Sequence, residues 1–290
     1  MNTVEHILPC RNKLGEGALW SIDEQKLYWV DIRNGSFSRF DPASDKQEVF
    51  QVGLPIGVLA LRASGGLVMA TKNGFALWDE QQRELKYIAQ PYGDDPDMRF
   101  NDGAVDARGR FWAGSMLNDE PPESGTLYRL DPDGSLHEMI TKVGVPNGIG
   151  WSPDNTIMYF TDSHPSRRTI FAYDYDIETG SIANRRVFSA AALEKGTPDG
   201  LTIDSEGFVW SAFWDGAKIV RFDPAGQIER MIDMPVLRPT SCVFGGSGLT
   251  DLYITSAAVD EPYRAQYPLS GDLFMIKTDI KGQPKYKFGG

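Results

Sequence analysis

Hydrophobic and polar positions repeat six times along the 290 residues of this chain. Each repeat contains an apolar run, a tight polar turn and a second apolar run that ends in an aromatic or large aliphatic residue. The repeats begin at Glu16, Ile56, Asn101, Asn147, Asp199 and Ser241, so that successive starts are 40 to 52 residues apart. This period is typical of the blades of a β-propeller, whereas helical periodicity is almost absent. We therefore predict an all-β fold, a six-bladed β-propeller with four-stranded antiparallel blades around a central channel.

Four strands are recognisable within a repeat from the alternation of side chains and the turn signals between them. In the first repeat they cover residues 18–22, 26–32, 36–41 and 47–52. Six such units occupy nearly the whole chain, which predicts one domain over residues 1–290. We expect a strand around His6–Cys10 to close the ring by pairing with the last blade, whose final strand is predicted at Lys285–Phe288, because closure removes exposed sheet edges. Short helical turns are expected at Ala190–Glu194 and Pro262–Gln266.

The connections between strands differ in length in a regular way. The turns between the first and second strands of each repeat are short and rich in Gly, Asp, Ser and Asn. The connections at the other end of the strands include the long segments 90–100, 115–124, 190–198 and 256–270. Chain direction alternates from strand to strand, so these long segments share one rim with the starts of the first strands. Long loops on a rigid scaffold usually carry function, and we predict a binding mouth at this rim.

Composition narrows the class of protein. A net charge of −11 argues against a nucleic-acid partner, because such binding depends on clustered Lys and Arg. No apolar run reaches the ~20 residues that span a membrane, and no secretory signal is visible, so we expect no membrane partner and a cytoplasmic location. Cys10 and Cys242 are expected to be free thiols. The three histidines, His6, His137 and His164, show no paired spacing, which argues against a histidine-based metal site.

Four polar side chains open the first strand of a repeat: Glu16, Asn101, Asn147 and Asp199. Equivalent positions in every blade point at one shared axis, so we expect these side chains to converge. Two carboxylates and two amide carbonyls form an oxygen-only set that suits Ca²⁺, Mg²⁺ or Mn²⁺. Asn-Gly and Asp-Gly are also common turn signals. Their occurrence at matched positions of the repeat nevertheless favours a metal or substrate site.

Five stretches carry a resemblance to a known family: LGEGALW (14–20), RFNDGAVDARGRFWAGSM (99–116), PNGIGWSPDNTIMYFTDS (146–163), IANRRVF (182–188) and TPDGLTIDSEGFVWSAFWDG (197–216). In order and spacing they resemble the senescence marker protein/gluconolactonase family over about residues 15–276. The resemblance implies a six-bladed propeller and a metal-dependent lactonase that acts on sugar lactones. Many bacterial members have proline where this chain has Phe100, so the resemblance does not define the sugar.

The resemblance also implies a metal site. Glu16, Asn147 and Asp199 match the metal ligands of the family, and Asp199 also matches the general base. The family uses calcium, zinc and other divalent ions. We expect one divalent ion, Ca²⁺ from the oxygen ligands, with Zn²⁺, Mg²⁺, Mn²⁺ or Fe²⁺ as alternatives.

Substrate contacts follow from the same motifs. Arg99 and Asn101 match residues that contact substrate in the family. A carboxylate in the long loop of the third repeat also contacts substrate in some members. Asp119 matches it best, with Glu120 and Glu123 as alternatives.

Together these observations predict metal-dependent hydrolysis of a sugar (aldono)lactone to the aldonic acid, of the gluconolactonase or pentonolactonase type, with a small-molecule sugar lactone as the partner. No Gly-x-Ser-x-Gly elbow is present and no histidine is placed to activate a serine, which argues against a serine esterase. Two alternatives stay open. One is an aryl-ester or organophosphate hydrolase on the same metal-binding propeller, and the other is a non-catalytic calcium-binding propeller.

Overall fold

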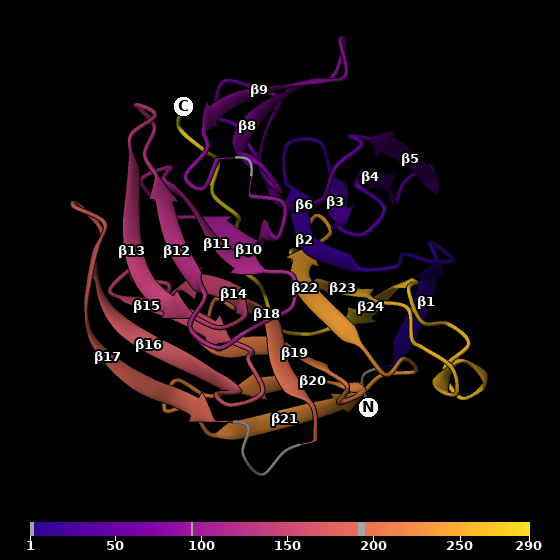
Figure 1. The fold of residues 1–290 in the computed structure, drawn as a ribbon. Coiled ribbons are helices and arrows are strands. Elements are labelled where there is room, and N and C mark those ends of the chain that lie inside the picture. Colours follow the sequence, from indigo (N-terminus) through magenta and orange to yellow (C-terminus); the bar gives the residue numbers. More distant parts are fainter. Residues whose placement is uncertain (1–2, 94, 191–194) are drawn as a thin grey trace.

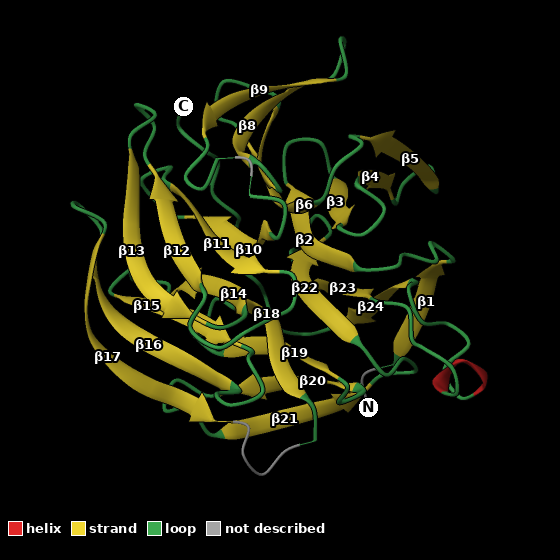
Figure 2. Ribbon diagram, viewed as in Figure 1, coloured by secondary structure: helices red, strands yellow, loops and turns green. Residues whose placement is uncertain are grey.

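The computed structural model describes residues 3–93, 95–190 and 195–290. Six four-stranded antiparallel sheets are arranged in a ring (Figure 1). In the described residues, regular helix is limited to one 3₁₀ turn, Tyr263–Ala265, and nearly everything else regular is strand (Figure 2). The predicted six-bladed β-propeller is therefore confirmed. The 3₁₀ turn falls within the helical turn expected at Pro262–Gln266, while the turn expected at Ala190–Glu194 lies almost wholly outside the described residues.

Blades 1 to 3 follow one another along the chain, each running from the innermost to the outermost strand. Blade 1 consists of β2 (Gly15–Ser21), β3 (Lys26–Asp31), β4 (Ser36–Asp41) and β5 (Lys46–Gln51). Blade 2 consists of β6 (Ile56–Leu61), β7 (Leu67–Thr71), β8 (Gly74–Asp79) and β9 (Glu84–Ala89). Blade 3 consists of β10 (Met98–Val105), β11 (Phe111–Leu117), β12 (Gly125–Leu130) and β13 (Leu136–Val143).

Blades 4 to 6 complete the ring. Blade 4 consists of β14 (Pro146–Trp151), β15 (Ile157–Asp162), β16 (Thr169–Asp176) and β17 (Ser181–Ala190). Blade 5 consists of β18 (Thr197–Ile203), β19 (Val209–Trp214), β20 (Lys218–Phe222) and β21 (Ile228–Asp233). Blade 6 consists of β22 (Pro239–Gly245), β23 (Asp251–Ser256), β24 (Leu273–Lys277) and β1 (Val4–Leu8).

The burial of a strand follows its place in the blade. Every residue of the second strand β7 is buried, because neighbouring blades cover both of its faces, and its sequence is accordingly an unbroken apolar run with one threonine. The outermost strand β5 is almost entirely exposed, and four of its six residues are polar. Fully buried aromatic side chains, among them Trp29, Trp112 and Trp210, fill the space between blades. Packing of blade against blade thus supplies the core.

The N-terminal strand closes the ring, as predicted. Residues of β1 pair antiparallel with β24, with Val4 opposite Ile276 and Leu8 opposite Leu273. The side chain of His6 lies 2.9 Å from Asp272 and adds a contact between the two chain ends of this blade. The first and last parts of the sequence therefore share one sheet.

The strand predicted at Lys285–Phe288 is wrong. The third strand β24 already has β1 as its outer neighbour, so blade 6 is complete without it. Residues 281–290, which we call the C-terminal segment, instead cross the end of the channel that carries the short turns. Isolated bridges join Gly282 to Asp204 of blade 5 and Phe288 to Arg62 of blade 2. The Phe288 side chain is 1% exposed and packs in the core between blades 2 and 3.

Each innermost strand has an irregular register against its neighbour close to its first residues. The shifts lie between Glu16 and Leu19, Ile56 and Val58, Phe100 and Gly103, Pro146 and Ile149, Pro198 and Leu201, and Pro239 and Cys242. A bulge bends a strand and redirects the side chain at that point. Six equivalent bulges at one end of the channel are consistent with the predicted convergence.

Both cysteines are free thiols, as expected. In the part of the chain that the structure describes, no helix is long and apolar enough to cross a membrane.

Candidate functional site

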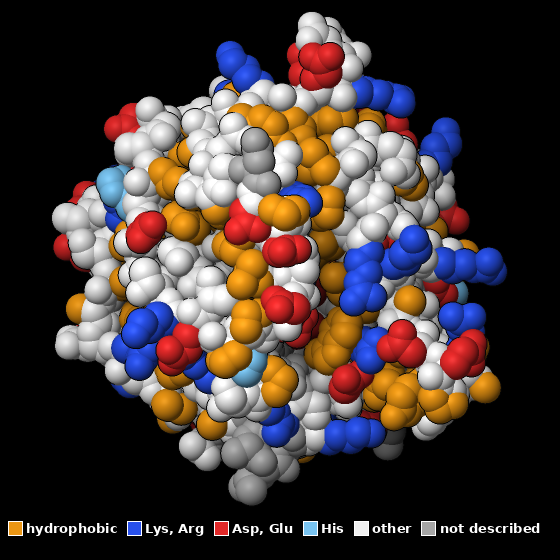
Figure 3. All heavy atoms as spheres, in the orientation of Figure 1, with side chains coloured by type: hydrophobic (Ala, Val, Ile, Leu, Met, Phe, Trp, Pro, Cys, Tyr) orange, Lys and Arg blue, Asp and Glu red, His pale blue; other side chains and the backbone are white. Residues whose placement is uncertain are grey.

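A cavity of about 250 Å³ opens where the innermost strands begin. Its polar wall is formed by Glu16, Arg99, Asn101, Glu120, Asn147 and Asp199, from blades 1, 3, 4 and 5. In the space-filling view, acidic side chains gather around a hollow near the centre of the face (Figure 3). The structure thus brings together five of the six residues predicted for the site, and Asp119 is the exception.

Two aspartates hold the chain in place just before Glu16 and Asn147. The carboxylate of Asp31, at the end of β3, accepts hydrogen bonds from the backbone N–H groups of Lys13 and Leu14 at 2.9 and 3.1 Å. The carboxylate of Asp162, at the end of β15, accepts from the backbone N–H groups of Gly144 and Val145, both at 3.1 Å. In both blades, an aspartate at the end of the second strand thus anchors the two residues that precede the strand carrying the candidate ligand.

The glycines that follow Asn147 and Asp199 lie too close to the neighbouring blade to carry a side chain. A Cβ atom at Gly148 would lie 2.7 Å from the carbonyl oxygen of Asp199, and one at Gly200 would lie 2.7 Å from Oγ of Ser241. Such distances are well inside van der Waals contact, so the glycines after Asn147 and Asp199 are required for neighbouring blades to approach. Packing between blades, and not turn formation alone, therefore explains the glycine in the Asn147–Gly148 and Asp199–Gly200 pairs.

Glu16 and Asp199 are buried carboxylates with few hydrogen-bond donors. They are 4% and 2% exposed. Among the described residues, the buried Oδ1 of Asp199 has no hydrogen-bond partner, and Oε2 of Glu16 accepts one 3.2 Å bond from the backbone N–H of Gly17. Burial, followed by repulsion from Asp102, raises the pKa of Glu16 well above its usual range. Burial, followed by repulsion from Glu16, does the same for Asp199. An unpaired buried carboxylate is costly, and a nearby cation would relieve that cost.

The side-chain amide of Asn147 has a defined orientation. Nδ2 of Asn147 donates to Oγ of Ser163 at 2.9 Å, and Ser163 in turn donates to the carbonyl oxygen of Pro198 at 2.6 Å. Oδ1 of Asn147 accepts a longer, 3.3 Å bond from Nδ2 of Asn101. The oxygen of Asn147 is therefore the end of the amide that is turned toward the site.

The side-chain amide of Asn101 has different hydrogen-bond partners from that of Asn147. Its Oδ1 accepts a 2.6 Å hydrogen bond from Nη1 of Arg99, and its Nδ2 donates to the carbonyl oxygen of Pro146 at 2.8 Å. Burial lowers the pKa of the Arg99 guanidinium, while Glu120 and Glu16 act in the opposite direction. Since its oxygen accepts from Arg99 and its NH₂ group donates to both Pro146 and Asn147, Asn101 has no free ligand oxygen.

The residues present fit an oxygen-coordinated divalent ion. Glu16, Asn147 and Asp199 supply carboxylate and amide oxygens, and Oδ1 of Asp199 lacks any other partner in the part of the chain that the structure describes. Hard divalent cations prefer such donors. Within residues 3–93, 95–190 and 195–290 no group of three or more His, Cys, Asp or Glu residues is arranged to hold a metal. The candidate set is consistent with that result, because it contains only two carboxylates.

The long loop of blade 3 contributes Glu120 to the cavity. Glu120 lines it and adopts a left-handed backbone conformation with φ 53°. Asp119 is exposed and is not among the lining residues, whereas Glu123 forms a 3.1 Å ion pair with Arg167. Sequence matching alone could not separate these neighbours, because the direction of each side chain depends on the loop conformation.

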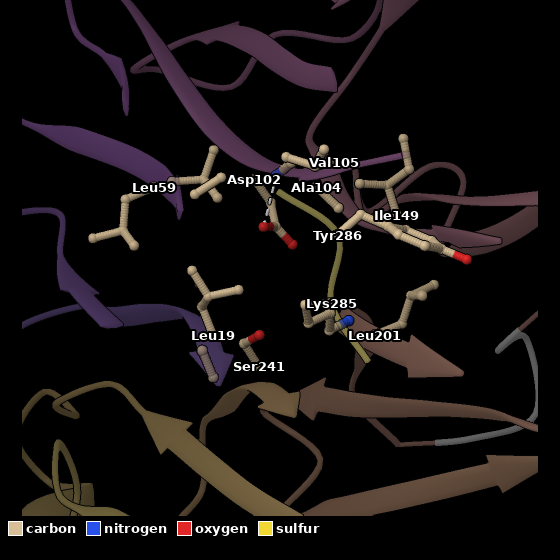
Figure 4. A pocket seen from close by; sticks show the side chains of 15 residues that line it. Leu19, Leu59, Asp102, Ala104, Val105, Ile149, Leu201, Ser241, Lys285 and Tyr286 are labelled. Carbon is tan, nitrogen blue, oxygen red and sulfur yellow. Dashed lines mark hydrogen bonds between the residues drawn. The ribbon is translucent and has the colours of Figure 1, made fainter. Parts of the chain in front are cut away.

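Further along the channel, a second, smaller cavity of about 40 Å³ lies between the first site and the C-terminal segment. Its lining includes Asp102, Ser241, Lys285 and Tyr286 (Figure 4). Burial raises the pKa of Asp102 to about 6, while the N–H of Gly103, at 2.7 Å, and Lys285 act in the opposite direction. Asp102 is a functional-site residue that the repeat pattern did not predict. The sequence feature that could have identified it is a carboxylate at a repeat position where the other five repeats have Gly or Cys.

Other residues that line the cavity were also missed, among them Ser163, Trp214 and Arg33. Ser163 and Trp214 line the cavity from blades 4 and 5, and Arg33 lines it from the loop after β3. The guanidinium of Arg238 lies 4.7 Å from the centre of the Trp214 ring. None of these three residues lies at the start of an innermost strand, so the six-fold repeat alone did not identify them.

Comparisons with known proteins agree with this architecture. The family model described as the SMP-30/Gluconolactonase/LRE-like region matches residues 14–258. Regucalcin of Xenopus laevis is 36% identical over 296 residues, which cover 99% of this chain and 98% of that protein. Pentonolactonase XacC of Haloferax volcanii is 34% identical over 293 residues, which cover 98% of each chain. The crystal structure of a calcium-binding protein, regucalcin, from Agrobacterium tumefaciens matches with a TM-score of 0.93 at 25% identity, over 99% of this chain and 97% of that chain.

Proposed function

The chain belongs to the SMP-30/Gluconolactonase/LRE-like family, and from this premise we propose that it hydrolyses a sugar lactone to the corresponding aldonic acid with one divalent metal ion. A relative named as a pentonolactonase, 34% identical over almost the full length, supports lactone hydrolysis in general. The observation in this chain that carries the proposal is Asp199, a buried carboxylate in a polar cavity whose Oδ1 has no partner within residues 3–93, 95–190 and 195–290.

Glu16, Asn147 and Asp199 would hold the ion. We expect Ca²⁺ because all three donors are oxygens, and Zn²⁺, Mg²⁺, Mn²⁺ and Fe²⁺ are the alternatives. When bound, such an ion polarises an ester carbonyl and lowers the pKa of a nearby water.

Asp199 acts as the general base. Its carboxylate accepts a proton from the attacking water while the water oxygen bonds to the lactone carbonyl carbon. The ring C–O bond then breaks, and the proton passes to the departing ring oxygen, which becomes a hydroxyl. General-base catalysis of this kind contributes about 10²–10⁴-fold to the rate. No covalent enzyme intermediate is required.

Arg99, Asn101 and Glu120 bind the substrate. The planar guanidinium of Arg99 donates in fixed directions, which suits the hydroxyls and acyl oxygen of a sugar lactone. Asn101 contributes by fixing that guanidinium through the 2.6 Å bond from Nη1 of Arg99 to its Oδ1, and the carboxylate of Glu120 accepts hydrogen bonds from hydroxyls. We assign this last role to Glu120 rather than Asp119, because Glu120 lines the cavity.

A panel of glucono-, xylono-, arabinono- and galactonolactones, assayed by acid release, tests the proposal. We expect turnover of at least one lactone, loss of activity after exhaustive chelation, and recovery when a divalent ion is added. Activity that survives complete chelation would contradict the metal-dependent mechanism. Faster turnover of aryl esters or phosphotriesters than of every lactone would favour the alternative hydrolase.

A non-catalytic calcium-binding propeller is the second candidate. It is favoured by relatives named regucalcin and by the solved structure described as a calcium-binding protein. Tight Ca²⁺ binding without turnover of any lactone or ester in the panel would support it.

We also propose one folding domain over residues 1–290 and a cytoplasmic location. A single calorimetric unfolding transition tests the first statement, and fractionation of the source cells tests the second.

A further inference from the structure

Ser163 joins the two neighbouring blades that carry Asn147 and Asp199. It follows the last residue of β15 in blade 4 and lines the cavity. Its Oγ accepts the 2.9 Å hydrogen bond from Nδ2 of Asn147 and donates the 2.6 Å hydrogen bond to the carbonyl oxygen of Pro198, the residue before Asp199. One hydroxyl therefore contacts one candidate ligand and the backbone next to another.

The direction of these two bonds follows from the donors and acceptors available. A serine hydroxyl has one hydrogen, and a backbone carbonyl such as that of Pro198 can only accept. The hydroxyl of Ser163 must therefore donate to Pro198, which leaves it as an acceptor toward Asn147. Only the NH₂ end of the Asn147 amide can satisfy it. The oxygen of Asn147 thereby faces Asn101, in the cavity that Glu16 and Asp199 also line.

The backbone of Ser163 is fixed independently of its side chain. Its N–H donates to the carbonyl oxygen of Val145 at 2.9 Å. The preceding Asp162 holds the N–H groups of Gly144 and Val145 and pairs with Arg167 at 2.7 Å. Replacing the hydroxyl alone leaves this anchoring network intact.

The equivalent position in blade 1 shows why a hydroxyl belongs in blade 4. There Ile32 follows the last residue of β3, and its N–H donates to the carbonyl oxygen of Leu14 at 3.0 Å, as Ser163 does to Val145. The candidate ligand of blade 1 is Glu16, a carboxylate with two oxygens that are both acceptors. The ligand of blade 4 is an amide, of which only one end can bind a cation.

We propose that Ser163 is a positioning residue for the divalent ion, acting through the orientation of the Asn147 amide and through its bond to the Pro198 carbonyl. This inference rests on the proposed metal site. Without the hydroxyl, the amide loses the shorter of the two contacts that distinguish its ends, the 3.3 Å bond from Asn101 alone remains, and the NH₂ end faces the ion in part of the molecules. Outer partners of metal ligands typically change metal affinity by about 10–100-fold.

The experiment measures binding of CaCl₂ and MnCl₂ to the metal-free full-length protein by isothermal titration calorimetry. Ser163→Ala is expected to raise the Kd by about 10–100-fold. Ser163→Thr keeps the hydroxyl and is expected to restore most of the affinity. Ser115→Ala is the matched control, because Ser115 is a buried serine in the second strand of blade 3 whose hydroxyl bonds to Thr126 of its own blade.

Activity provides a second readout that a merely structural role would not affect in the same way. Ser163→Ala is expected to require more metal for half-maximal activity, with kcat restored close to the wild-type value at saturating metal. Its metal-free melting temperature is expected to stay close to that of Ser115→Ala.

The outcomes separate this inference from the proposed function. If the wild-type protein binds neither ion, the proposed metal site fails. If the wild type binds and Ser163→Ala binds equally well, or Ser115→Ala weakens binding as much, only the role of Ser163 is overturned. If Ser163→Ala weakens metal binding in a protein that hydrolyses no lactone, the role of Ser163 stands while the proposed reaction fails.

Discussion

Nη1 of Arg99 donates a 2.6 Å hydrogen bond to Oδ1 of Asn101, and this contact decides which end of the Asn101 amide faces the rest of the site. The asparagine oxygen is occupied by arginine, so its NH₂ group is turned toward Pro146 and Asn147. The spacing of the repeats suggested four oxygen ligands. The geometry instead favours three, with Asn101 and Arg99 as a coupled pair beside them.

Replacement of Arg99 by lysine is expected to impair substrate binding without removing the metal. Lysine keeps the charge but loses the planar fork that can bond Asn101 and substrate at once. Loss of a hydrogen bond to a charged group costs about 1.5–3 kcal/mol, so kcat/KM should fall by about 10–100-fold. The measurement is steady-state kinetics with titration of the metal in parallel. A metal affinity that falls as much as kcat/KM would place Arg99 in the metal site instead.

Asp199→Asn is expected to lower kcat by at least about 10²-fold, because the amide can no longer accept the proton from water. The same change should weaken metal binding, since Asp199 would serve as ligand and base. Both effects are measured on the metal-reconstituted variant, with kcat taken at saturating metal. A variant that retains wild-type kcat under those conditions contradicts the general-base role.

The metal-free protein is expected to lose stability as pH rises, through its buried carboxylates. For Asp102 the pKa is about 6 in the folded protein, against an ordinary value of 3.8. Below that ordinary value both states are protonated. Above it the unfolded chain releases the proton first, so the folded state binds more protons and the free energy of unfolding falls as pH rises through this window.

Asp102→Asn isolates this contribution. The variant cannot ionise at this position, so its stability relative to wild type should increase from about pH 4 to about pH 7. Thermal melts of both proteins in a chelating buffer at several pH values measure the difference. A difference that does not vary with pH contradicts the assignment. Since the pKa values of Glu16 and Asp199 are also raised, an added divalent ion should stabilise the wild type more at pH 7 than at pH 4.5.

Asp106→Ala is expected to destabilise the fold strongly. Oδ2 of Asp106 accepts hydrogen bonds from Nε1 of Trp112 at 2.9 Å and from Nε of Arg110 at 2.7 Å, deep between blades. Removal of one partner of a buried ion pair costs about 3–5 kcal/mol, because the remaining charge is uncompensated. The check is denaturant unfolding. Glu48→Ala serves as the control, since its ion pair with Arg39 is at the surface and should contribute less than about 1 kcal/mol.

Phe288→Ala is expected to lower the free energy of unfolding by about 3–5 kcal/mol, the usual cost of deleting a large buried side chain. Phe288 lies in the C-terminal segment, and its backbone bonds to Leu61 and Ala63 at 2.8 Å each. Denaturant unfolding measures the loss. The site lies at the opposite end of the channel, so the folded variant should keep a KM close to that of wild type. A loss below about 1 kcal/mol would show that the segment adds little to the core.

The sequence by itself determined the blade pattern and most of the candidate site. Alternating side chains and turn residues act over a few neighbouring positions, so strands and turns could be read locally. The six-fold repeat then placed Glu16, Asn147 and Asp199 at equivalent positions, and the ring brings equivalent positions together.

Other features depended on contacts between distant parts of the chain. The amide orientation of Asn147 follows from partners in another blade and in the loop after β15, and the choice of Glu120 over Asp119 follows from a loop conformation. The path of the C-terminal segment was mispredicted because an apolar residue such as Phe288 fits a strand pattern and a buried anchor equally well. Only the tertiary structure decided between them, because burial is a property of what surrounds a residue and not of its neighbours in sequence.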